Sequence, residues 1–137
     1  MVIYNETNGF KIENAEQISS WVEFVIHQEN KLLGEINYIF CDDNYLLKIN
    51  INKLKHNTLT DIISFDYTVG NIISGDIYIS TERVKENSIE LSNVFKDELN
   101  RVIIHGVLHY CGYKDKTDDD KLLMRAKEDY YLSLRTF

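Results

Sequence analysis

The sequence predicts an α/β (α+β) protein in which a small mixed sheet of about four strands is covered by about five helices. Short runs of alternating β-branched and aromatic residues, longer runs with apolar residues three and four apart, and turn-forming residues between them lead to this fold class. No repeat or low-complexity linker divides the 137 residues. Because this length is ordinary for one domain, we expect a single domain over residues 1–137.

Four short runs have the composition of strands. Their predicted bounds are residues 2–5, 35–41, 62–67 and 76–80. In the second run Ile36, Tyr38 and Phe40 alternate with other residues, which indicates one buried face. Gly70 and Gly75 flank the connection between the last two runs. These two strands could therefore form a hairpin or pair through neighbouring strands.

Five runs are typical of helices. They are residues 15–31, residues 45–51 before a polar loop at 53–58, residues 81–89, a segment from Ser92 or Asn93 to Tyr110, and residues 117–134. Trp21 falls on the apolar stripe of the first run, and we assign it to the core. Asp42 or Asp43 can cap the second helix. Thr117, with Asp120 three residues on, forms the N-terminal signature of the last.

The helix near the C-terminus carries the most informative feature, since His105, His109 and Asp115 fall within eleven residues. Histidines four apart leave the same face of a helix one turn apart. Gly112 can adopt the left-handed conformation that ends a helix, so the chain can turn back and bring Asp115 toward the imidazoles. Two nitrogens and one oxygen suit Zn²⁺ and leave one tetrahedral position open for water. We therefore predict a catalytic rather than a structural metal site.

Other interpretations of these residues stay open. Histidines at helical spacing can be half-buried core residues, and Asp115 can be an ordinary loop carboxylate. Cys111 lies on another side of the helix, and we interpret it as a small buried apolar residue. His27 and His56 lack ligand-spaced partners. Gly106 stands where His-Glu-x-x-His peptidases place their catalytic glutamate, which disfavours that chemistry and leaves space near the metal for a phosphate.

Three motifs together have a recognisable order. They are Thr-Asp-Ile-Ile-Ser-Phe at 60–65, Gly-Asp-Ile-Tyr-Ile-Ser at 75–80 and His-Gly-Val-Leu-His-x-x-Gly at 105–112. Over nearly the whole chain the sequence resembles the YbeY family, bacterial zinc-dependent endoribonucleases of ribosomal RNA maturation. The resemblance implies one zinc ion held by His105, His109 and Asp115, and the same small sheet covered by helices.

The resemblance also implies a function. It is that of a single-strand-specific metallo-endoribonuclease acting in 16S rRNA 3′ end maturation and ribosome quality control. The implied partners are single-stranded rRNA and the small ribosomal subunit, with no membrane and no DNA, and the implied location is the cytoplasm. Two alternatives remain: a non-catalytic, zinc-containing ribosome assembly factor, and a metallopeptidase or amidase.

Two positions depart from the family pattern. The motif usually ends in Gly-x-Asp-His, with a third histidine as ligand, whereas Lys114 and Asp115 hold the last two places here. A carboxylate ligand lowers the net charge of the metal centre, so we expect slower turnover than in three-histidine members. A family arginine, six residues before the threonine of the first motif, is Leu54 here. Lys53, Lys55 or Lys114 could replace that phosphate clamp as point charges, although each is more simply a solvated lysine.

Other polar residues are candidates for supporting roles. Asp61, Ser64 and Asp76 lie on the predicted strands or directly before one, and could orient the metal ligands or form strand-end turns. Lys114 is a further candidate for substrate contact. The acidic run 118–120 is best interpreted as solvated charge at the start of a helix.

Charge and composition limit the choice of function. With 22 acidic and 15 basic residues the net charge is −7, whereas proteins that grip nucleic acid usually show a basic patch. We therefore expect weak binding to free RNA and efficient action only in a ribosomal context. No apolar run is long enough to span a membrane, and the first residues do not form a secretion signal. Cys41 and Cys111 are expected to be free thiols.

Overall fold

The computed structural model describes residues 1–54 and 59–137, and of residues 53 and 54 only the backbone. The candidate phosphate contacts at positions 53 and 55, the substitution at position 54 and the histidine at position 56 therefore lie outside the described side chains. Helix α2, Asp43–Leu54, continues through two of the residues that were expected in a loop, so that part of the prediction is wrong.

Four strands form one mixed sheet in the order β1-β2-β4-β3. They are β1 Val2–Glu6, β2 Leu32–Cys41, β3 Ile62–Asp66 and β4 Ile72–Ser80. The first two pairings are parallel, and β3 and β4 form an antiparallel hairpin. The predicted mixed sheet is therefore confirmed, with β2 and β4 each beginning earlier in the chain than expected.

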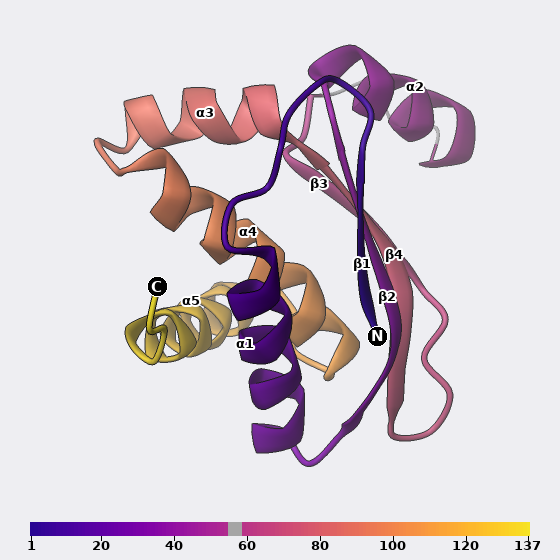
Figure 1. Cartoon of the computed structure of the whole chain (residues 1–137), viewed down its shortest axis with the longest axis vertical. Coiled ribbons are helices and arrows are strands. Elements are labelled where there is room, and N and C mark those ends of the chain that lie inside the picture. Colours follow the sequence, from indigo (N-terminus) through magenta and orange to yellow (C-terminus); the bar gives the residue numbers. More distant parts are fainter. Residues whose placement is uncertain (55–58) are drawn as a thin grey trace.

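Five helices accompany the sheet in the described part of the chain. Besides α2 they are α1 Ala15–Gln28, α3 Thr81–Glu90, α4 Phe95–Tyr110 and α5 Asp118–Ser133. In Figure 1 α1, α4 and α5 lie on one side of the sheet, and α2 lies near one end of it. Helix α4 packs against β3, β4, α3 and α5, which places it at the centre of the fold.

The alternation of strand side chains produces two apolar clusters. Ile36, Tyr38 and Phe40 of β2 enter the main core with α1 and α4, which also contains Trp21. Cys41, one position out of phase, joins a smaller cluster with residues of α2 and β3. Successive side chains of a strand point to opposite faces, so α2 covers the face opposite α4.

Backbone geometry explains where the predicted helix bounds were wrong. Asn30 has φ +60°, a left-handed conformation just beyond α1, which ends at Gln28. Ser92 has φ +56° and lies outside α4, whose N-cap is Val94 without a side-chain hydrogen bond. At the other predicted caps, Asp42 accepts a hydrogen bond from the backbone of α2, and Thr117 accepts one from the backbone of α5.

Gly75 lies inside β4 rather than before it. A side chain does not fit at this position, because Tyr110 of α4 occupies the space beside it. A β-carbon at Gly75 would clash with the Tyr110 hydroxyl. That hydroxyl donates to the carbonyl oxygens of Phe65, at 2.9 Å, and Asp76, at 3.2 Å. The C-terminal end of α4 is thereby fixed to both strands of the hairpin.

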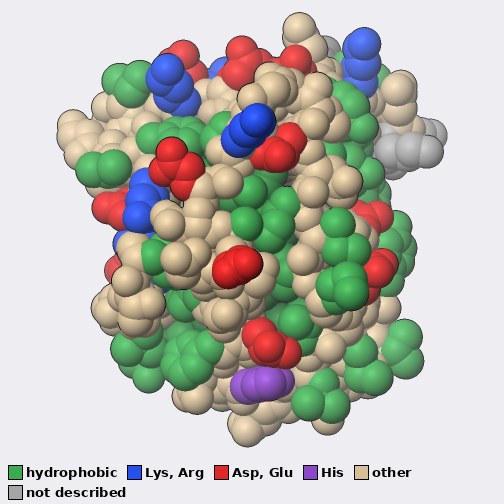
Figure 2. All heavy atoms as spheres, viewed as in Figure 1, with side chains coloured by type: hydrophobic (Ala, Val, Ile, Leu, Met, Phe, Trp, Pro, Cys, Tyr) green, Lys and Arg blue, Asp and Glu red, His purple; other side chains and the backbone are tan. Residues whose placement is uncertain are grey.

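Charged groups of both signs are interspersed on the face of the molecule shown in Figure 2, and no continuous basic surface appears there. None of the helices in the described ranges is both long enough and apolar enough to cross a lipid bilayer.

Candidate metal centre

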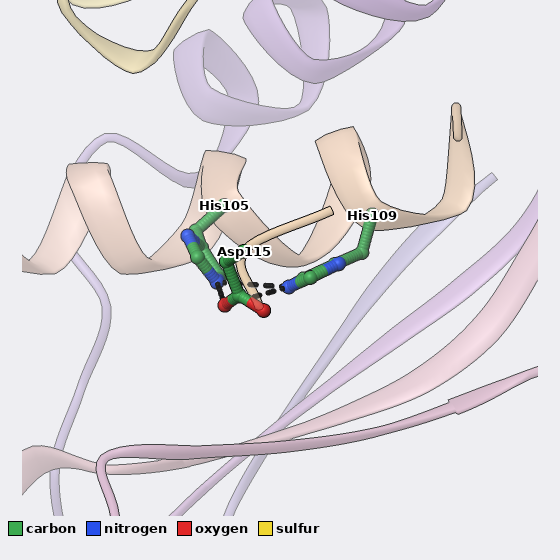
Figure 3. Close-up of side chains that lie close together, drawn as sticks. All are labelled: His105, His109 and Asp115. Atoms are coloured by element: carbon green, nitrogen blue, oxygen red, sulfur yellow. Dashed lines mark hydrogen bonds and ion pairs between the residues drawn. The ribbon is translucent and has the colours of Figure 1, made fainter. Parts of the chain in front are cut away.

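Three predicted ligand atoms meet beside α4. The Nε2 atoms of His105 and His109 are 3.0 Å apart, and Oδ2 of Asp115 lies 3.2 Å from each of them (Figure 3). The two histidines leave neighbouring turns of α4. Asp115 comes from the loop beyond Gly112, whose φ of +108° is the left-handed conformation predicted there.

These distances fit a small divalent cation. Bonds of 2.0 to 2.2 Å to tetrahedral zinc place neighbouring ligand atoms about 3.3 to 3.6 Å apart. The three atoms are slightly closer together than this, so small side-chain rotations suffice to admit an ion. Within the described residues no fourth histidine, cysteine or carboxylate joins the group.

His105 is oriented from behind by a buried carboxylate. Its Nδ1 lies 2.6 Å from Oε2 of Glu128 on α5, and Glu128 is only 4% exposed. The other oxygen of Glu128 accepts a hydrogen bond of 2.9 Å from Arg101. Burial favours a neutral Glu128, but the hydrogen bonds from His105 and Arg101 outweigh it and lower the pKa of this carboxyl.

Sequence reasoning missed Glu128, although a signal existed. Met124 and Tyr131, four residues before and three after it, are both buried. A glutamate on the buried stripe of a helix needs a partner, because an unpaired buried charge is costly. The partner could not be identified from the sequence, because it depends on how α5 crosses α4.

His109 is oriented by backbone. Its Nδ1 lies 3.0 Å from the carbonyl oxygen of Tyr113, in the loop that leads to Asp115. The Tyr113 hydroxyl in turn donates at 2.7 Å to Glu29, the residue that follows the last turn of α1. Glu29 also accepts a hydrogen bond from Tyr131. The loop is thus connected to both α1 and α5.

These outer partners determine which ring nitrogens are free. A carboxylate and a carbonyl oxygen can only accept, so Nδ1 of each histidine carries the proton. The two neutral imidazoles then direct unprotonated Nε2 atoms at each other and at the Asp115 carboxylate. Three acceptors facing one another repel unless a cation or a proton lies between them.

The pKa of His105 follows from the same arrangement. Burial alone lowers it, but the hydrogen bond to Glu128 and the charges of Glu128, Asp115 and Asp61 outweigh that effect, so the pKa of His105 is raised. The negative charges that favour a proton on this ring would equally favour a cation at Nε2.

The centre opens into a pocket of about 550 Å³. Asp61 and Ser64 line it, as do Glu98 and Arg101, which sequence analysis did not identify. Burial raises the pKa of Asp61, so this carboxyl keeps its proton to higher pH than an exposed one.

The remaining candidates lie elsewhere. Lys114 is exposed and Asp76 accepts a hydrogen bond from Asn37, and neither is among the pocket residues. Cys111 is a free thiol that packs at the edge of the main core.

The sequence analysis predicted that Gly106 leaves space beside the metal, and the structure shows that it does not. It is buried toward the sheet, and a β-carbon there would approach Ile77 of β4 to 2.9 Å. The absence of a side chain at this position lets α4 lie close to the sheet.

The fold and this centre together describe a class: an α/β protein whose central helix presents a candidate three-ligand metal centre in an open pocket. The family model described as Endoribonuclease YbeY matches residues 2–135. The chain belongs to the endoribonuclease YbeY family.

Relatives cover nearly the full length of the chain. It is 60% identical over 134 residues to Endoribonuclease YbeY of Flavobacterium psychrophilum, spanning 98% of this chain and 96% of that protein. It is 55% identical to Endoribonuclease YbeY of Flavobacterium johnsoniae, with the same coverage. The solution structure of TM1509 from Thermotoga maritima superposes with a TM-score of 0.70 at 25% identity, covering 97% of this chain and 87% of that one.

Proposed function

We propose that this chain is a zinc-dependent endoribonuclease that hydrolyses phosphodiester bonds of single-stranded RNA. The observation that carries the proposal is the convergence of three acceptor atoms, from His105, His109 and Asp115, at the wall of an open pocket. Three acceptor atoms at these distances suit a bound cation. The side of that cation that faces the pocket would be open to substrate. Membership of a family named for endoribonuclease activity supports RNA as that substrate.

When bound, a zinc ion would act as a Lewis acid toward the phosphate and lower the pKa of a water molecule toward 7. His105, His109 and Asp115 would hold it. The protein contributes orientation: Glu128 and the Tyr113 carbonyl fix both rings with Nε2 toward the pocket.

Side chains around the metal centre also have proposed roles in substrate binding and turnover. Asp61 and Ser64 line the pocket, and we propose that they contact a bound RNA or position the ligands. Asp115 brings a negative charge that a histidine would not. For this reason we retain the expectation of slower turnover than in members with three histidine ligands.

The cellular setting that we propose is the cytoplasm, with the 3′ end of 16S rRNA on the small ribosomal subunit as substrate. With a net charge of −7 the chain has little general attraction for polyanions. Efficient cleavage is therefore expected only in a ribosomal context. We also propose that residues 1–137 form one domain.

One experiment separates this function from its alternatives. Zinc content is measured, and the wild type is incubated with single-stranded RNA and with casein, with a chelator and His109→Ala as controls. RNA cleavage that both controls abolish is the expected result. Bound zinc without either activity would indicate an assembly factor, and chelator-sensitive proteolysis alone would indicate a peptidase.

A further inference from the structure

We infer that Lys121 and Arg125 of α5 form a phosphate-binding track that holds the RNA backbone beside the metal centre. The inference rests on the proposed function and assigns the residues that hold its substrate. It names α5 as the element along which the RNA strand runs.

The described lining of the pocket contains three cationic side chains, and one of them is already paired. Arg101 donates to Glu128 at 2.9 Å and to Asp129 at 2.6 Å, and its side chain is only 19% exposed. A guanidinium held at both ends by carboxylates has little charge left for a phosphate. Arg101 therefore acts on Glu128, and among the described lining residues the cations left to attract substrate are Lys121 and Arg125.

Arg125 and Lys121 are available. The side chain of Arg125 is 58% exposed, and the carboxylate oxygen near it, Oε1 of Glu128, is 3.8 Å away and already accepts from Arg101. Lys121 is exposed and forms no ion pair within the described ranges. An exposed guanidinium can bind phosphate in a bidentate manner, and a lysine binds it as a point charge.

Their spacing along α5 forms a line that leads to the metal centre. Lys121, Arg125 and Glu128 are separated by four and three residues, so they share one face of the helix. At a rise of 1.5 Å per residue, Arg125 lies about 4.5 Å and Lys121 about 10.5 Å before Glu128 along the axis. Because Glu128 contacts His105, successive phosphates along this line would reach the candidate ligands.

Carboxylates around the pocket would repel RNA phosphates, so binding depends on nearby cations that offset them. Four carboxylates, from Asp61, Glu98, Asp115 and Glu128, line the pocket together with the three cations. The acidic run 118–120 precedes Lys121 at the start of the same helix. Attraction for RNA is therefore local and short-ranged, and we expect it to weaken steeply with salt.

The test compares Lys121→Gln, Arg125→Gln and the double variant with Lys85→Gln. Lys85 is exposed on α3 and lies outside the pocket lining, and its variant changes the net charge by the same one unit as each single variant does. The zinc-loaded proteins are assayed for cleavage of single-stranded RNA and, separately, for binding of a labelled oligoribonucleotide over a range of salt concentrations.

For the double variant we expect an affinity loss and KM increase of about tenfold at low salt, with kcat within about twofold of wild type. The slope of log affinity against log salt should become shallower by about 1.4, or about 0.7 for each lost contact to a single strand. Lys85→Gln should match the wild type in every measurement. Zinc content and melting temperature should be unchanged in all four variants.

An unchanged KM and salt slope in the double variant would overturn the track, as would an equal loss in Lys85→Gln. If the wild type binds zinc but cleaves no RNA, the proposed function fails. The binding measurement would then still decide whether Lys121 and Arg125 hold a phosphate backbone.

Discussion

The two histidines of the metal centre are held in different ways. His105 is fixed by a side chain of another helix, the buried Glu128 of α5, which Arg101 holds in turn. His109 is fixed by the carbonyl oxygen of Tyr113, four residues further along its own chain. One support is charged and comes from a tertiary contact, and the other is neutral and comes from the local backbone.

This difference shows where the centre is vulnerable. A single substitution on α5 removes the support of His105, whereas no side-chain substitution removes the carbonyl that holds His109. A charged partner also shifts the pKa of the ring more than a neutral one does. Orientation, proton affinity and metal affinity should therefore respond more strongly to changes behind His105.

The largest effects are expected from the ligands themselves. His105→Ala and His109→Ala each remove one of three metal contacts, so both should lose more than about 100-fold in zinc affinity, beyond what loss of an outer partner costs. Zinc titration with a competing chelator measures this. Retention of wild-type affinity by either variant would exclude that histidine as a ligand.

Removal of the charged support should come next. Glu128→Gln keeps the shape of the side chain but loses its charge, and a drop of about 10- to 100-fold in zinc affinity is expected. Asp129→Asn is the matched control, because Asp129 also binds Arg101 but is 57% exposed and, among the described side chains, forms no hydrogen bond or ion pair with His105. Equal losses in both variants would show that Arg101, rather than the His105 contact, matters.

A change behind His109 should be weaker. Tyr113→Phe removes the hydroxyl that binds Glu29 but keeps the carbonyl that holds His109. We expect less than about tenfold loss of zinc affinity, with about 1 kcal/mol lower stability from the lost hydrogen bond. Chelator competition and urea unfolding measure the two quantities. If this variant lost more affinity than Glu128→Gln, the comparison between the two supports would be wrong.

Proton binding sharpens the same contrast. In chelator-treated protein His105 should titrate above the ordinary histidine range, and Glu128→Gln should lower its midpoint, as followed by NMR. A raised folded-state pKa stabilises the folded protein fully below the unfolded pKa, and this contribution disappears as pH rises through the folded value. The metal-free wild type should therefore lose stability over that window, and a midpoint insensitive to Glu128→Gln would contradict the assignment.

The smallest effect is expected at the third ligand. Asp115→His removes one negative charge from the centre, so a severalfold rise in kcat on RNA is expected if the carboxylate slows turnover. Zinc content serves as the control for occupancy. Unchanged or lower activity at full occupancy would refute the charge argument.

Local sequence signals predicted most of the fold. Periodicity located the strands and helices, and Gly112 and Thr117 marked the helix ends where the structure has them. The approach of Asp115 to the two imidazoles also followed from local geometry, and its metal-binding role stays a prediction. What these signals share is that cause and effect lie within a few residues of each other.

The features that sequence reasoning missed depend on contacts between elements. Glu128 and Arg101 meet because α5 crosses α4, and Gly106 faces Ile77 because α4 lies close on β4. Ser92 adopts a left-handed conformation, so α4 begins later in the chain than predicted. Serine does not signal such a conformation in the sequence as glycine does. None of these features has a spacing or motif that identifies its partner.

The most direct test of the account is the zinc coordination of the purified protein, measured as metal stoichiometry together with X-ray absorption or diffraction of the zinc-loaded form. We predict one zinc ion per chain, bound by Nε2 of His105, Nε2 of His109 and a carboxylate oxygen of Asp115, with one exchangeable water. Failure to bind zinc, or an ion enclosed by four protein donors, would contradict the account.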